Sequence, residues 1–482
     1  MVFAPRATLG SLPLALAIVL SACSQSGPER AAAEAAASGA AADVREVTGA
    51  PARFVWVQGD GTDPETEGDQ LILVGFDTED GRGERVIVGE RRSIVKPRLT
   101  SRADRIVFSS RILPGPPEIF VVNWDGTGLR KLADGFAMSL WRNPADGSDW
   151  VYAGTDNTQY DFAKVTRFPI DAPDRRELVW DRTLVSMEGF AVTPDGRQAG
   201  GMWPWPAAGI ADLAAGTWKK FGEGCWTSLT SARGPLFWYF DGAHRNVTMV
   251  DPDAGTRWMV NLNGAPGFEG AEVSHPRWTN HPRFLVMTGP YNQGGDNQVR
   301  SGGRQVEVYL GRFSEDFSRV EQWVRVTKNS GGDSHPDAWI DLARSPHPRQ
   351  PRGPIGPEHA RVSGAREQKP AAARGRLVLN VRLTRPGTIP NPQAILPYRH
   401  ALVVNEYEII DRLEGAYADA TIRVAQWAIR DGAVLPEARK PAGAAFTLAV
   451  ERYDAHPELE GERLVADRET STRSLYYDVG RR

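Results

Sequence analysis

Cysteine is scarce in this sequence, since only Cys23 and Cys225 occur among 482 residues. If Cys23 is lipidated, Cys225 has no partner within the chain, and a disulfide framework and a cysteine-based metal site are then excluded. Positive and negative side chains nearly balance, with a net charge of −3, and no basic block argues for nucleic acid as a partner. Phosphate loops, dinucleotide fingerprints and a Gly-Xaa-Ser-Xaa-Gly elbow are also missing. Long amphipathic helical patterns are few, whereas Gly, Pro and Trp are plentiful, and this combination predicts an all-β protein.

The N-terminal residues have the order of a secretory signal. Arg6 precedes an apolar stretch over residues 12–20 that is too short to span a bilayer, and small residues lead into Cys23. The end of this segment, Leu-Ser-Ala-Cys, resembles the lipobox of bacterial lipoproteins. The resemblance implies that residues 1–23 are a signal whose Cys23 is lipidated, and Ser24 then favours the outer membrane, on its periplasmic face. The alternative is an ordinary secretory signal cleaved near Ala22.

Residues 24–52 are rich in Ala, Ser, Gly and Glu and hold almost nothing apolar larger than Val. Because such a segment cannot bury a core, we expect a disordered tether there.

An internal repeat organises residues 53–345. One unit, residues 96–132, reads as a short strand, a polar turn, an apolar strand, a third strand, an Asp-Gly turn and a closing strand. The pattern returns roughly every 40 to 50 residues, which is the period of four-stranded propeller blades. The first unit, at residue 54, lacks its leading strand, and the leading strand at residues 334–340 has no blade after it. We therefore expect the two to close the ring, which gives six blades, or seven if a degenerate unit lies within residues 156–185.

The repeat motifs, above all residues 97–108 and 193–197, resemble the TolB-like family of periplasmic propellers. The likeness covers about three-fifths of the chain, and several turns depart from the usual Ser-Pro-Asp-Gly. It implies a binding or scaffolding role more often than catalysis, as fold-level analogy.

A proline-rich linker is expected over residues 346–375, and a second β domain over residues 376–482. Strand patterns cover residues 377–383, 401–413, 421–429, 446–451 and 475–479. The arrangement is similar to small OB-like barrels of the netrin type, and a β-sandwich or such a barrel is predicted, with a docking or binding role.

Two histidines provide the sharpest candidate for chemistry. His275 and His335 occupy equivalent places in two repeats, each as Ser-His-Pro, and leading strands line the channel of a propeller. Glu269, Glu272 and Asp333 lie just upstream. Imidazoles with a carboxylate suit a divalent metal or a general base. Polysaccharide lyases built on propellers use histidines around a metal in a comparable channel, which suggests lyase-like activity on acidic sugars. The alternative is a structural turn in which His bonds to backbone.

Trp203 and Trp205 form an unusual Trp-Pro-Trp-Pro cluster. Their rings are either a platform on which sugar rings stack or filling between blades. Cys225, beside Trp226, is expected to be a small buried core residue.

The leading hypothesis is an envelope lipoprotein, lipid-anchored in the membrane, whose propeller binds an envelope protein or a polysaccharide without catalysis and without a cofactor. The alternative is a metal-dependent, carbohydrate-active enzyme that uses His275 and His335. The sequence names neither ligand nor partner.

Overall fold

The computed structural model describes most of the chain beyond residue 38, and we refer to these parts as the described residues. They are residues 39–63, 66, 68–111, 115–157, 160–230, 236–268, 272–291, 302–349, 353–358, 375–395, 398–466 and 474–480. The predicted signal and Cys23 lie outside them. No helix within the described residues is long and apolar enough to cross a membrane.

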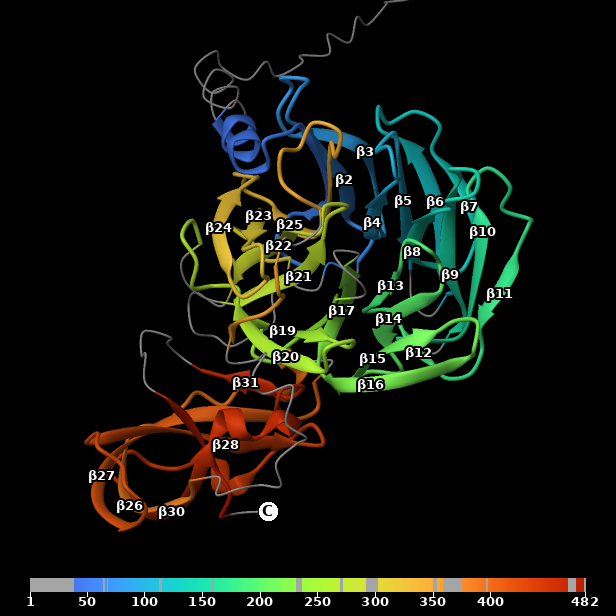
Figure 1. Cartoon of the computed structure of the whole chain (residues 1–482). Coiled ribbons are helices and arrows are strands. Elements are labelled where there is room, and N and C mark those ends of the chain that lie inside the picture. Colours follow the sequence, from blue (N-terminus) through green and yellow to red (C-terminus); the bar gives the residue numbers. More distant parts are fainter. Residues whose placement is uncertain are drawn as a thin grey trace, which may run out of the picture.

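Six antiparallel sheets form a ring of blades around a channel (Figure 1). Blade 1 pairs β25 (Gly332–Ile340) with β1 (Ala52–Gly59), β2 (Leu71–Asp77) and β3 (Arg85–Arg92). Blade 2 comprises β4 (Val95–Leu99), β5 (Arg105–Ser110), β6 (Glu118–Asn123) and β7 (Arg130–Asp134). Blade 3 comprises β8 (Phe136–Arg142), β9 (Asp149–Asn157), β10 (Asp161–Pro169) and β11 (Glu177–Trp180), with β12 (Val185–Ser186) on β10.

The other three blades are regular. Blade 4 comprises β13 (Phe190–Val192), β14 (Gln198–Met202), β15 (Ala207–Asp212) and β16 (Thr217–Glu223). Blade 5 comprises β17 (Cys225–Thr230), β18 (Leu236–Phe240), β19 (Asn246–Asp251) and β20 (Thr256–Asn261). Blade 6 comprises β21 (Glu272–Trp278), β22 (Phe284–Tyr291), β23 (Glu307–Phe313) and β24 (Val320–Arg325).

The predicted ring closure is confirmed. Strand β25 pairs antiparallel with β1, with Phe54 opposite Ala338, so a late strand completes the first blade. The described residues within 156–185 supply strands of blade 3 and form no further blade. The propeller therefore has six blades and not seven. The predicted Asp-Gly turn after β6 is also present: Gly126 has φ +87°, and a Cβ there would stand 2.7 Å from the Ile87 carbonyl oxygen.

The expected tether ends earlier than the sequence indicates. Residues 39–48 form a helix, and Val44 and Val47 are buried in one cluster with Phe54 and Phe284 of blades 1 and 6. Figure 1 shows this helix, in blue, beside β24. The apolar residues of the segment are few, but their spacing of three places them on one helical face, which was enough to pack. The part of the tether before residue 39 lies outside the described residues.

The start of the expected linker also packs rather than extending freely. The His347 side chain is 2.9 Å from the Val47 carbonyl oxygen, and Ile355 packs on the large apolar cluster of blades 5 and 6. Residues 359–374 lie outside the described residues.

The C-terminal domain is a closed five-stranded β-barrel rather than a sandwich. The five strands pair in the ring β27-β28-β32-β30-β26 and back to β27, with β29 and β31 added at the edges. The strands are β26 (Leu377–Arg385), β27 (Ala401–Glu414), β28 (Thr421–Arg430), β29 (Ala433–Val434), β30 (Ala445–Arg452), β31 (Arg463–Val465) and β32 (Leu475–Asp478). Four 3-10 turns connect them: η1 (Pro392–Ile395), η2 (Pro436–Ala438), η3 (Tyr453–Ala455) and η4 (Pro457–Leu459).

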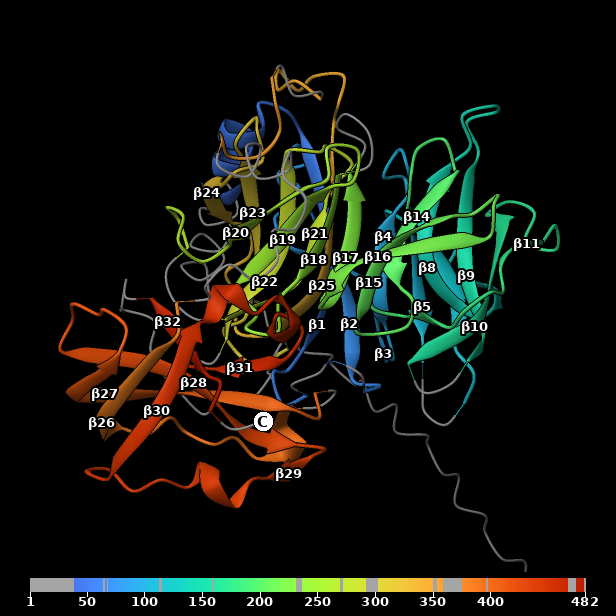
Figure 2. The same cartoon turned by 60° about the horizontal axis from the view of Figure 1, so that its bottom comes forward.

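The barrel docks on one face of the propeller at blades 4, 5 and 6 (Figure 2). Ile395, Tyr398, Ala401 and Ile429 of the barrel belong to one buried cluster with Phe240 and other residues of those blades. Because the two domains share this apolar core, they form one packed body.

Candidate functional site

Four of the innermost strands carry the same distortion. The register of β4, β17, β21 and β25 against the next strand shifts at a β-bulge. At the bulge, Lys96, Trp226, His275 and His335 have φ between 44° and 51°. This left-handed conformation is costly for residues other than glycine, by about 1 kcal/mol or more each. A bulge re-aims a side chain, and the four side chains converge on one cavity in the channel.

The structure brings the two predicted histidines together. The rings of His275 and His335 lie 4.0 Å apart, and the Trp226 ring lies 4.8 Å from His275. The backbone N–H of His335 donates to Nδ1 of His275 at 3.3 Å. Burial lowers the pKa of His275 to about 3, and burial also moves the pKa of His335 well below its usual value. Both imidazoles are therefore neutral at physiological pH.

The predicted carboxylate partners do not join the histidines. Asp333 accepts hydrogen bonds from Trp56 and Gln58, each at 2.9 Å. Glu272 is engaged by Arg463 of the barrel, and Glu269 lies outside the described residues. Within the described part of the chain, no three His, Cys, Asp or Glu side chains are placed to hold a metal ion. The arrangement offers two imidazoles without the carboxylate that the metal hypothesis assigned to Asp333.

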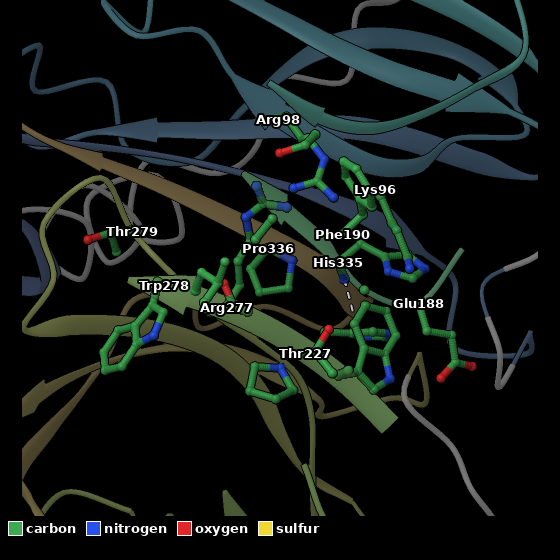
Figure 3. Close-up of a pocket in the computed structure, with 18 of the residues that line it drawn as sticks. Lys96, Arg98, Glu188, Phe190, Thr227, Arg277, Trp278, Thr279, His335 and Pro336 are labelled. Carbon is green, nitrogen blue, oxygen red and sulfur yellow. Dashed lines mark hydrogen bonds between the residues drawn. The ribbon is translucent and has the colours of Figure 1, made fainter. Parts of the chain in front are cut away.

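Cationic side chains, which the sequence analysis missed, form another wall of the cavity. The cavity has a volume of about 160 Å³, and Lys96, Arg98 and Arg277 line it (Figure 3). The Lys96 ammonium lies 4.1 Å from the Trp226 ring centroid and donates to the Met187 carbonyl. Burial lowers the pKa of Lys96 to about 7, although the nearby Glu188 carboxylate opposes this effect.

The sequence did carry a signal for these cations. Lys96-Pro97-Arg98 repeats the pattern of His275-Pro276-Arg277, and His335-Pro336-Asp337 follows it with an acid in the last place. An alignment on the proline places Lys96 with the histidines, and Arg98 with Arg277. Trp226 has no such proline, so only the register of β17 reveals its equivalent position.

The two candidate glycan-stacking tryptophans pack inside the protein. Trp203 is 1 % exposed, donates to the Gly209 carbonyl at 3.0 Å, and lies 4.9 Å from the Trp180 ring. Trp203 therefore occupies the position expected of a side chain that fills space between blade elements, the second of the two alternatives. Trp205 is half-buried and meets Tyr398 of the barrel edge to face at 6.0 Å.

A buried polar network links the channel to the barrel. Cys225 is a free, buried thiol as expected, and its Sγ lies 3.2 Å from the Tyr398 hydroxyl. That hydroxyl is also 2.8 Å from Nε2 of His244, whose Nδ1 contacts Tyr291. Burial above all raises the pKa of Tyr398, with the Cys225 thiol and Glu188 adding to it. Since Cys225 directly precedes Trp226, which lines the cavity, the barrel contacts the strand that carries Trp226.

One ion pair crosses the domain interface entirely out of water. Nη2 of Arg463 lies 2.6 Å from Oε2 of Glu272, and their side chains are 0 % and 2 % exposed. Arg463 Nη1 also donates to the Gly242 carbonyl at 3.3 Å. Nothing in the sequence pairs these residues, which lie 191 positions apart.

The sequence matches no protein-family model and no curated protein sequence. Several solved structures resemble the fold. TolB from Acinetobacter baumannii is 16 % identical with a TM-score of 0.41, and the match covers 63 % of this chain and 72 % of that one. A gluconolactonase from Xanthomonas campestris is 16 % identical (TM-score 0.33, 49 % of this chain and 86 % of that one). One structure from an analysis of two prolyl endopeptidases is 11 % identical (TM-score 0.33, 80 % of this chain and 61 % of that one). These similarities show a TolB-like β-propeller fold and do not determine an activity.

Proposed function

We propose that this protein is a non-catalytic binding scaffold of the bacterial cell envelope, and that a protein or glycan partner inserts a group into its propeller channel. One observation carries the proposal. Lys96, Trp226, His275 and His335 are held in a strained backbone conformation at equivalent places in four blades, and all four face the same cavity. Packing alone does not require this strain, which is characteristic of functional sites.

The chemistry of the cavity supports binding over turnover. Its imidazoles are neutral, buried and next to each other, and Asp333 is held by Trp56 and Gln58 instead of orienting either ring. In nucleophile–base arrangements a third group orients the base, and a catalytic metal needs further ligands. The envelope location rests on the lipobox-like sequence before Cys23. The helix at residues 39–48 limits any tether to residues 24–38.

Site-specific crosslinking tests the channel. Ser228 lines the cavity and is half-buried, so a photoreactive residue there lies where a partner would enter. Met259 on β20 is 50 % exposed and supplies a control position outside the cavity. In cells of the source organism, we expect a discrete adduct from position 228 and none from position 259. Equal labelling from both positions, or no adduct from position 228, would overturn the channel as the binding site.

The anchor is tested separately. Full-length protein should incorporate radiolabelled palmitate and sediment with membranes, and Cys23→Ser should do neither. Membrane association without labelling would contradict the lipid anchor.

A further inference from the structure

Arg98 is a buried cation whose guanidinium is incompletely bonded. It is 7 % exposed and lines the channel cavity. Among the described residues, its Nε has no hydrogen-bond partner, and no carboxylate lies within ion-pair distance of the side chain. A guanidinium stays charged in proteins and presents five donors in a planar fork. Such a group is costly to bury unless an acceptor meets it.

The Asp337 carboxylate, on the neighbouring strand β25, is already in use. Asp337 lies 2.8 Å from Nε of Arg277 through one oxygen, and its other oxygen accepts the Leu99 N–H at 2.8 Å. Figure 3 shows the Arg98 and Arg277 side chains converging in the same part of the pocket. Burial, and then the charge of Arg277, moves the pKa of Arg98 well below its usual value. Arg277 thus has Asp337 as its carboxylate partner, whereas Arg98 has none among the described residues.

Other groups in the cavity are also free to bond an acceptor. The Thr227 hydroxyl is buried without a hydrogen-bond partner among the described residues, and so is Nδ1 of His335. Both residues line the cavity, as does Lys96. An incoming anion therefore finds a cationic fork, a second cation and a hydroxyl donor within one enclosed space.

Two aromatic rings of the cavity, those of Trp226 and Phe190, are covered by neighbouring side chains. Lys96 covers the Trp226 ring at 4.1 Å, and the edge of His275 meets it at 4.8 Å. Phe190 packs on Tyr152 and Trp203 at 5.8 and 5.9 Å. Sugar recognition commonly stacks a ring on an open aromatic face, and a cavity of about 160 Å³ suits one small group better than several sugar units.

We infer that the channel captures a carboxylate of a protein partner, either the end of its chain or an Asp or Glu side chain, with the Arg98 guanidinium as the main receptor and Lys96 as the second cation. This inference rests on the proposed function and names its ligand chemistry. The planar carboxylate matches the guanidinium fork with two parallel hydrogen bonds.

The experiment uses the full chain, with small carboxylate compounds, a matched amide and phosphate as probes. Calorimetry measures their binding, and thermal unfolding measures their effect on the Tm. The probes are acetyl-trialanine with a free C-terminal carboxylate, its C-terminal amide, acetyl-aspartate amide, and inorganic phosphate. We expect both carboxylate probes to bind, and the trialanine amide to bind at least about tenfold more weakly than its free acid. Arg98→Gln should weaken the free acid about tenfold or more, and Arg98→Lys should restore part of the loss.

A matched control variant and a measurement of stability separate a loss of binding from a loss of folding. Arg102 lies in the same blade but is exposed and paired with Asp104 at 2.9 Å, so Arg102→Gln should leave binding unchanged. Because Arg98→Gln removes a buried charge that lacks a full partner, its Tm should equal or exceed that of the wild type. The free-acid peptide should raise the Tm of the wild type and not that of Arg98→Gln. A lower Tm for Arg98→Gln would indicate a structural role and overturn the inference.

The outcomes separate this inference from the proposed function. If the amide binds as well as the acid, if phosphate binds better than both carboxylates, or if no probe binds at millimolar concentration, the carboxylate receptor is wrong. An adduct from position 228 would leave the scaffold standing in each case. If the acid binds through Arg98 while position 228 yields no adduct, the carboxylate receptor stands, and the proposal that a cellular partner occupies the channel fails.

Discussion

Replacing Arg463 by methionine should destabilise the whole molecule, because this arginine joins the barrel to the propeller. Its Nη2 lies 2.6 Å from Oε2 of Glu272 with both side chains out of water. At an effective dielectric constant of about 20, two unit charges at this separation attract by about 6 kcal/mol before desolvation is counted. Loss of Arg463 leaves the Glu272 carboxylate buried without its opposite charge, so we expect Arg463→Met to cost about 3–5 kcal/mol of unfolding free energy.

The double variant tests whether the two charged side chains stabilise the protein as a pair. Arg463→Met with Glu272→Met replaces the ion pair by apolar side chains of similar volume, and such exchanges are often neutral or stabilising. We expect the double variant to lie within about 2 kcal/mol of the wild type, which gives a large coupling energy in the cycle. Urea unfolding followed by fluorescence and circular dichroism measures all four proteins. If the two single costs simply add, the pair does not act as a unit and the reasoning is refuted.

Substitutions of four further residues are expected to change the stability of the protein in specific ways. Trp203→Ala should lower the unfolding free energy by about 3–5 kcal/mol, because the Trp203 ring is enclosed. Trp205→Ala should lower it by about 1–2 kcal/mol, because Trp205 is only half-buried at the interface with the barrel. Equal losses of unfolding free energy in urea would contradict this difference in packing. Burial raises the pKa of Asp333 to about 7, so the folded state keeps a proton that the unfolded state releases. Wild-type stability should therefore fall between pH 4 and 7, by roughly 1.4 kcal/mol per pH unit, and Asp333→Asn should flatten that slope in calorimetry. Lys96 has the opposite sign: with its pKa lowered to about 7, the unfolded state binds the extra proton above that pH. Stability relative to Lys96→Met should rise from pH 7 to pH 9, and a constant difference would show that Lys96 does not titrate there.

The architecture was predictable because it depends on local patterns that repeat. A strand–turn–strand pattern recurs along the chain. Because the first unit lacks its leading strand and the last leading strand has no blade after it, the two incomplete ends of the repeat are expected to pair. The pairing of β25 with β1 follows from that count, whereas the register that places Phe54 opposite Ala338 comes from the structure. The barrel strands were predictable as well, since β26 and β27 begin at the residues where the patterns begin. Their closure into a barrel depends on strand partners far apart in sequence, which no periodicity reveals.

The site was only half predictable, for a geometric reason. His275 and His335 share an evident motif, and a common place in the repeat implied a common place in the channel. Asp333 was grouped with them by sequence proximity, yet its hydrogen bonds to Trp56 and Gln58 draw its carboxylate to the neighbouring strand. Arg98 could not be singled out, because its importance lies in the partners that it lacks. An unmet charge is a property of packing and cannot be read from a residue type.

Ring closure and the candidate site depend on each other. His335 lies on β25, the strand that closes the ring onto β1, while Lys96 and Arg98 lie on β4 of the next blade. Trp226 and His275 come from blades 5 and 6, so the cavity is complete only when the closing strand is in place. A group bound between these strands would stabilise the closed ring over any form in which β25 has left β1, by an amount that grows with its affinity and concentration. The strained bulges are tolerated for the same reason: a closed ring fixes each inner strand from both sides, and it holds conformations that an open sheet would relax.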